Sequence, residues 1–174
     1  MQITRSKAEI EALVRDNAAY REDIDFIQET ISKDQIFIGH LTQKSPAGNE
    51  VSVALTVGMY KRNLPELIFS GVPSNVVQNI VAALSEGLDF DREFLRSERL
   101  KQILNFDVMA LPIDDPNSLE VMQVCRDYYT LIGRHEMQAV QLVFADENGS
   151  FPWSPECSDA NKACQPLFGV TAGF

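Results

Sequence analysis

Two segments at the start of the chain carry apolar residues at helical spacing. Ser6 and Glu9 form a capping box, so a first amphipathic helix is expected from about residue 7 to residue 19. The same spacing predicts a second helix over residues 21–33. Residues 1–33 are therefore expected to form a helical segment that packs on the main domain or extends from it.

From residue 35 the apolar positions recur with a period of two, which is typical of strands. Two such segments, 35–42 and 51–58, lie on either side of a turn-forming stretch, and a third spans residues 66–72. Short connections favour antiparallel pairing, so the three segments predict a meander.

Helical spacing returns after Pro73. A helix is expected from there to Gly87, whose backbone freedom suits a helix C-terminus. Residues 88–105 mix charged and aromatic residues and predict a short irregular or helical excursion over the core. A further helix is expected to follow an N-cap at Asp115 and to end at Gly133.

Two more strands are expected, over residues 106–113 and 137–145. The dipeptide Asn148-Gly149 is a strong hairpin signal and predicts a short return strand directly after it. Residues 154–174 are rich in proline, serine, cysteine and glycine, so we expect a coil that lies over the body of the domain.

These elements predict the α+β class: a mainly antiparallel sheet of about five to six strands with helices packed on it, plus the N-terminal helical extension. Residues 34–174 are expected to form a single α+β domain with a coil-like C-terminal tail, because no linker or repeat divides them. A length of 174 residues agrees with one domain.

The charge balance narrows the class of partner. Fifteen basic against 25 acidic residues leave a net charge of −10, which opposes direct binding to nucleic acid. No apolar run is long enough to span a membrane, and the first residues lack a signal peptide's hydrophobic region. A cytoplasmic location without membrane binding is therefore expected. Three cysteines without a close pair favour reduced thiols.

Most chemical motifs are missing from the sequence. It holds no phosphate-binding loop, dinucleotide-binding glycine pattern, nucleophile elbow or zinc-protease motif. Asp89, Asp91 and Glu93 alternate as in a calcium loop, but Phe94 and Leu100 stand where that loop needs glycine and glutamate. We therefore expect a solvated acidic segment there.

Cysteine and histidine offer one metal hypothesis. Cys157 and Cys164 could join His40 or His135 at a zinc ion, but their spacing fits no common zinc pattern. Cys125 lies on the apolar stripe of a helix and is expected in the core. His40 is expected half-buried on a strand face and His135 as a helix cap, so neither a metal nor a cofactor is expected.

Two places combine polar chemistry with structural constraint. Glu66 is the first residue of a predicted strand, directly after Pro65. Its carboxylate could serve as a base or bind a ligand. Alternatively, it forms a structural ion pair with Arg62. Trp153 is the only tryptophan and follows a turn. Together with Tyr129, its ring either stacks against a planar ligand or a protein partner, or packs at the edge of a small apolar core.

Four blocks of sequence resemble a known family. They are VALTVG at residues 53–58, LPELIFSGVP at residues 64–73, QLVFADENGSFPW at residues 141–153 and QPLF at residues 165–168. Their order and spacing resemble the widespread bacterial family of unknown function numbered 4262, over about residues 35–169. That family has no established activity, so the resemblance implies a fold and shared positions rather than a reaction.

Two positions depart from the family pattern. Asn63 and Leu64 stand where many members have Gly-His, so no role that depends on that histidine is carried over. Phe144 replaces the more usual tryptophan and keeps apolar bulk. The positions expected to form a shared site or scaffold are Gly58, Pro65, Glu66, Gly71, Gln141, Trp153 and Gln165.

Binding is the leading functional hypothesis, because amides, a carboxylate and an aromatic ring occur without a poised nucleophile and base. We expect a non-catalytic binding or regulatory domain for an unknown small molecule or protein partner. The ligand-binding candidates are Glu66, Tyr129, Gln141, Trp153 and Gln165, and the scaffold residues are Gly58, Pro65, Gly71 and Gly149.

Two alternatives stay open. One is a hydrolase-type enzyme in which Glu66 works with a tyrosine or histidine, which requires the two groups to lie within hydrogen-bond reach. The other is an acidic inhibitor that mimics nucleic acid, although acidic and basic residues are interleaved. A homodimer through the N-terminal helices is also open. All the binding hypotheses assume that the Pro65-Glu66 corner and the Trp153 corner lie together.

Overall fold

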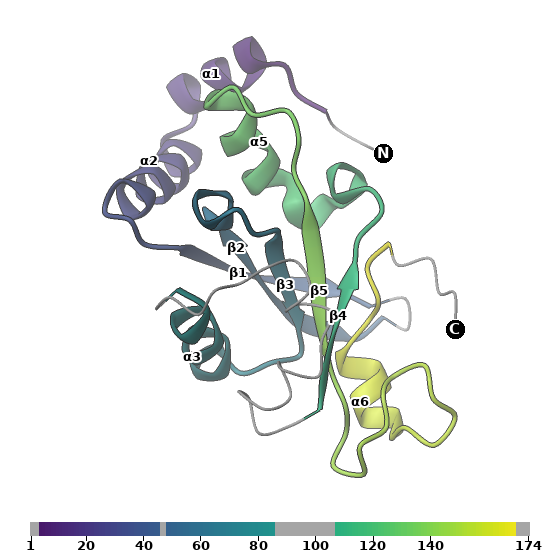
Figure 1. Cartoon of the computed structure of the whole chain (residues 1–174). Helices are drawn as coiled ribbons and strands as arrows, with labels where there is room; N and C mark the ends of the chain where they lie inside the picture. The colour runs from purple at the N-terminus through teal and green to yellow at the C-terminus, as the bar shows by residue number, and fades with distance from the viewer. Residues whose placement is uncertain (1–3, 46–47, 86–106, 170–174) are drawn as a thin grey trace.

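A five-stranded mixed sheet forms the centre of the computed structural model, which describes residues 4–45, 48–85 and 107–169 (Figure 1). The strands lie in the order β1-β2-β3-β5-β4. They are β1 Phe37–Lys44, β2 Glu50–Val57, β3 Glu66–Ser70, β4 Val108–Pro112 and β5 Ala139–Phe144. Together with the helices on it, the sheet confirms the α+β class.

The strands β1, β2 and β3 form the predicted antiparallel meander, and β4 is antiparallel to β5. The central pair differs, because β3 and β5 are parallel, with Glu66 opposite Ala139 and Phe69 opposite Leu142. As a result, β5 lies between two strands that both precede it in the chain.

Helices cover both faces of the sheet (Figure 1). Within the described residues the α-helices are α1 Lys7–Asp16, α2 Ala18–Ser32, α3 Ser74–Ser85, α5 Gln123–Leu131 and α6 Asp159–Cys164. The same residues form short 3₁₀ helices at η1 Met59–Arg62, η3 Pro116–Ser118 and η4 Glu120–Met122.

The two faces of the sheet bury separate apolar clusters. On one face α2 and α5 pack against the sheet, with Ile27 and Leu55 fully buried. On the other face α3 packs by Val77 and Ile80 against Leu67. Burial of apolar side chains on both faces makes the central strands apolar along nearly their whole length.

The predicted capping box at Ser6 and Glu9 is formed, and α1 begins where it was expected. The helix ends earlier than residue 19, because Asn17 takes extended backbone between α1 and α2. The Asn17 side chain accepts a hydrogen bond from the Tyr20 backbone N–H and so starts α2 as its N-cap.

A buried carboxylate ties the N-terminal helices to α5. Asp127 on α5 is 1% exposed and accepts a hydrogen bond from Arg5 Nη1 at 2.5 Å. The Tyr20 hydroxyl and Gln123 Nε2 donate to the same carboxylate. Burial, and then the hydrogen bond to Asp127, raise the pKa of Tyr20 well above its ordinary value.

The helix expected after Asp115 begins later than predicted. Asp115 caps a turn by accepting from the Asn117 N–H, but that turn is only η3. Leu119 then takes extended backbone with ψ of 124°, and α5 begins at Gln123. This break allows Met122 to be fully buried in the core.

The turn at Asn148-Gly149 is formed, and Gly149, with φ of +78°, donates to the Asp146 carbonyl. The return strand predicted after it is wrong, because the described chain continues in turns. The Asp146 carboxylate accepts from the Ser150 and Ser158 N–H groups and holds this chain in a loop. The tail is also not all coil, since Ser158 caps α6 by accepting from the Asn161 N–H.

α3 begins where it was expected. Its predicted end at Gly87, the excursion over residues 88–105, and the acidic residues Asp89, Asp91 and Glu93 lie outside the described residues. In the part of the chain that the structure describes, no helix has the length and apolarity needed to cross a membrane.

Candidate functional site

Glu66 is a fully buried carboxylate at the first residue of β3. Its Oε1 accepts from the backbone N–H groups of Gly58 and Met59 at 2.9 and 3.0 Å. The Tyr129 hydroxyl donates to the same oxygen at 2.6 Å, and the Thr56 hydroxyl donates to Oε2 at 2.6 Å. One side chain thus joins β2, the turn after it, β3 and α5.

Burial raises the pKa of Glu66 to about 7, because the charged carboxylate loses its hydration. The hydrogen bonds from Thr56, Tyr129 and the two backbone N–H groups oppose this rise. Burial, and then repulsion between a phenolate and the Glu66 carboxylate, raises the pKa of the Tyr129 hydroxyl.

The predicted ion pair between Glu66 and Arg62 does not form. Arg62 Nη2 instead donates to the Asp34 carbonyl at 3.0 Å and lies 3.9 Å from the Asp34 carboxylate. Glu66 is also not at an open strand mouth, since the turn that follows Gly58 closes over it. Gly58 permits this turn, because its φ of +113° is strained for any residue with a side chain.

Tyr129 connects this buried carboxylate with two surface hollows. Its ring packs edge to face with Tyr60 at 5.3 Å, and the Arg134 guanidinium lies 4.6 Å from the Tyr60 ring centroid. These three residues line a hollow of about 220 Å³. Tyr129 and Arg134 also line a second hollow of about 360 Å³ between α5 and the N-terminal segment.

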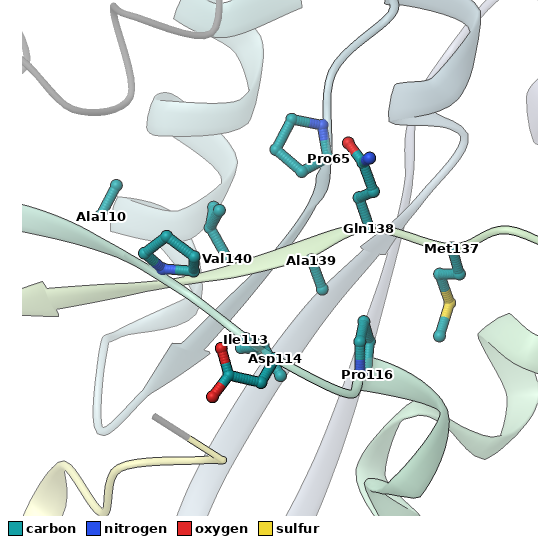
Figure 2. Close-up of a pocket in the computed structure, with 10 residues that line it drawn as sticks. Pro65, Ala110, Ile113, Asp114, Pro116, Met137, Gln138, Ala139 and Val140 are labelled. Carbon is teal, nitrogen blue, oxygen red and sulfur yellow. The ribbon is translucent and has the colours of Figure 1, made fainter. Parts of the chain in front are cut away.

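A third and larger hollow, the pocket of Figure 2, lies where β4 ends and β5 begins. Its volume is about 390 Å³, which is within the range of small-molecule sites. The walls are mostly apolar, and Asp114 and Gln138 add a carboxylate and an amide. The lining residues are Pro65, Ala110, Pro112, Ile113, Asp114, Pro116, Met137, Gln138, Ala139 and Val140.

A model of a domain of unknown function, DUF4262, matches residues 30–158. The chain belongs to the DUF4262 family. Comparison with characterised proteins gave no match, and neither did comparison with solved structures. The DUF4262 region holds the whole sheet, α5 and the Glu66–Tyr129 pair, whereas α1, most of α2 and α6 lie outside it.

Two of the ligand-binding candidates in this DUF4262 protein hold the C-terminal segment. Gln141 is fully buried, donates to the Pro166 carbonyl and accepts from the Phe168 N–H, both at 2.9 Å. Gln165, 4% exposed, bonds to the backbone of Phe144. Neither side chain lines the pocket of Figure 2.

The structure does not bring the Trp153 corner to Glu66. Glu66 pairs with Ala139, the first residue of β5, whereas the loop that carries Trp153 follows the other end of that strand. Asn161, after the loop, donates to the carbonyl of Phe144, the last residue of β5. The hypothesis that the two corners form one site is therefore wrong. Trp153 stacks on Phe151 with ring centroids 4.8 Å apart.

The other polar candidates also lie apart. His40 is exposed rather than half-buried, and its Nε2 lies 3.3 Å from the Ser74 hydroxyl. Cys157 is buried and Cys164 is exposed, while Cys125 is buried in the core as predicted. Among residues 4–45, 48–85 and 107–169, no group of three His, Cys, Asp or Glu side chains is placed to hold a metal ion.

Sequence reasoning missed most residues around the hollows. Of the candidates, Pro65 lines the pocket of Figure 2, and Tyr129 lines the two smaller hollows. Arg5, Arg126 and Arg134 come from separate parts of the chain, so no local motif marked them. The sequence Arg134-His135 after a helix end was the one available signal.

Proposed function

We propose that this DUF4262 protein is a non-catalytic binding domain for a small molecule with an apolar body, which the pocket of Figure 2 accommodates. The observation that carries the proposal is the pocket itself: about 390 Å³, lined by eight apolar residues and by Asp114 and Gln138. Apolar walls give affinity through burial, and a few placed polar groups orient a ligand.

The geometry around Glu66 supports binding over a reaction. Tyr129 lies within hydrogen-bond reach, which the hydrolase alternative requires. However, the Glu66 carboxylate has no exposed surface, and its two oxygens accept four hydrogen bonds. A base needs contact with the proton that it takes. We therefore assign Glu66 a positioning role, in which it fixes the ring of Tyr129.

A small molecule is also favoured over a protein partner. The large apolar side chains exposed on the described residues are Phe26, Met109 and Ile132. They lie on three separate elements, on α2, on β4 and directly after α5. Single exposed apolar residues are ordinary on monomeric proteins and do not mark an interface.

Thermal stabilisation by ligands tests this proposal. The full chain would be titrated with aromatic and medium-chain aliphatic alcohols, amides and acids, because a ligand that binds only the folded state raises Tm. We expect at least one class to raise Tm in the wild type. No rise with any class would contradict the proposal.

A pair of variants locates the site. Ala110→Leu adds bulk to the wall of the Figure 2 pocket and should remove the ligand-dependent rise in Tm. Ala145→Leu adds the same bulk at the other end of β5 and should leave the rise intact. Equal responses of both variants would place binding elsewhere. The Tm of each variant without ligand shows that it folds.

A further inference from the structure

We infer that the ligand is an amphipathic anion: its apolar body occupies the pocket of Figure 2, and its carboxylate or phosphate reaches a neighbouring basic groove. This inference rests on the proposed function and adds the chemical class of the ligand. The basic groove is the hollow of about 360 Å³ between α5 and the N-terminal segment, and its lining includes Arg5, Lys7, Asn117, Arg126, Arg134 and Met137.

The charge of the basic groove is opposite to that of the protein. Arg5, Lys7, Arg126 and Arg134 line it, and none of the described residues in its lining is acidic. The whole chain has a net charge of −10. A groove lined by cations on an acidic protein attracts anions locally while the rest of the surface repels them.

Not all four cations are equally available to a ligand. Arg5 pairs with Asp127, and Arg126 donates to the Asn117 carbonyl and to Gln123. Lys7 and Arg134 are exposed at the groove, although Arg134 also packs over the Tyr60 ring. These two side chains are therefore the ones that we expect to contact the anion. An Arg guanidinium matches the geometry of carboxylate and phosphate oxygens.

The groove and the pocket share a wall. Met137 lines both hollows, and the adjacent residues Pro116 and Asn117 line the pocket and the groove respectively. In Figure 2 the Met137 and Ala139 side chains point to the side on which Pro116 lies. Methionine is flexible and adapts to ligand shape, so one molecule can contact both hollows past this side chain.

The distribution of cations sets the orientation of the ligand. Lys7 and Arg134 line the basic groove and are exposed there, whereas no described Lys or Arg lines the Figure 2 pocket, so the anionic group is attracted to the groove. Glu136 lines the smaller hollow with Tyr60 rather than the groove, so it does not contribute to the groove lining.

Matched acids and amides test the inference directly. Naphthoate and naphthamide, and octanoate and octanamide, have nearly the same shape and differ in charge. Titration calorimetry with the full chain should show the acid binding about tenfold more tightly than its amide, as expected for charge-assisted hydrogen bonds. Added salt should weaken the binding of the acid but not that of the amide. Naphthyl phosphate, which carries a phosphate in place of the carboxylate, should also bind more tightly than the amide.

Variants assign the effect to the groove. In the double variant Lys7→Gln/Arg134→Gln, the affinity for the acid should fall to within about twofold of the affinity for the amide. The affinity for the amide itself should not change. Lys162→Gln with Lys33→Gln removes the same charge from α6 and from the residue after α2, and should keep the full preference. The Tm of both double variants confirms that they fold.

The outcomes separate the two proposals. Equal binding of acid and amide, or an acid preference that the groove variant keeps, overturns the inference while the proposed function stands. No binding by any of these compounds contradicts the proposed function itself.

Discussion

Gln165 pairs with the backbone of Phe144 as a neighbouring strand would. Its Oε1 accepts from the Phe144 N–H at 2.9 Å, and its Nε2 donates to the Phe144 carbonyl at 2.8 Å. Gln141 binds in the same bidentate manner to the Pro166 carbonyl and the Phe168 N–H. Two buried amides thus attach the end of the described chain to β5.

Replacing Gln165 by alanine should destabilise the protein by about 2 kcal/mol, because the Phe144 N–H loses the Gln165 acceptor, while the Phe144 carbonyl loses the Gln165 donor and keeps that of Asn161. Urea unfolding measures this difference. Gln28→Ala on the exposed face of α2 is the control and should change stability by less than about 0.5 kcal/mol. Equal effects of the two variants would show that the Gln165 pairing contributes nothing.

The pKa of Glu66 predicts that the contribution of this residue to stability falls as pH rises. The folded protein keeps the proton to about pH 7, whereas the unfolded chain loses it near the ordinary value of 4.5. Between these values the folded state binds more protons, so the free energy of unfolding decreases with pH. The total change is about 3 kcal/mol, at about 1.4 kcal/mol for each pH unit.

Glu66→Gln isolates this contribution, because the amide oxygen keeps three acceptor contacts and the amide does not titrate. The free energy of unfolding of the variant minus that of the wild type should increase by about 3 kcal/mol from about pH 5 to about pH 8. Chemical unfolding at both pH values measures it. Parallel pH profiles for the two proteins would contradict the assignment of this titration to Glu66.

Removing the Asp127 carboxylate should release the N-terminal helices. Asp127→Ala leaves Arg5, Tyr20 and Gln123 without their shared acceptor, so we expect a loss of about 3 kcal/mol. Amide hydrogen exchange should increase in α1 and α2 more than in the sheet. Asp16→Ala, at an exposed carboxylate, should have little effect. Unchanged amide exchange in α1 and α2 of the Asp127 variant would show that the Asp127 carboxylate does not hold these helices on α5.

Gly71 should not tolerate a side chain. A Cβ at this position would lie 2.6 Å from the Cys164 carbonyl oxygen, and its φ is +66°. Gly71→Ala should therefore cost about 3 kcal/mol, from overlap and backbone strain together. At Gly133, with φ of +75°, no described atom lies within 4 Å of an added Cβ. Gly133→Ala should cost only about 1 kcal/mol, and equal losses in urea unfolding would refute the steric argument.

Much of the fold could be predicted from local sequence patterns. The capping box at Ser6 and Glu9, the period-two strands and the turn at Gly149 all depend on residues a few positions apart. Such features are determined by nearby chemistry, so the sequence predicts them well. Leu119 shows the limit, because its extended backbone depends on burying Met122 in a core assembled from distant elements.

Long-range pairing was not visible in the sequence. Nothing local to Leu67 or Val140 indicates that their strands run parallel. The same limit applies to the site. Glu66 was recognisable as a carboxylate at the head of an apolar strand, but its contact with Tyr129 joins residues 63 positions apart. The basic groove likewise combines the N-terminal segment with α5.

The position of β5 has a consequence for synthesis. When the ribosome has produced residues up to Pro112, β3 and β4 both exist, but the strand that joins them does not. Until β5 arrives, the growing chain exposes the backbone edge of β3, which invites pairing with other chains. Fragments that stop before Phe144 should consequently aggregate.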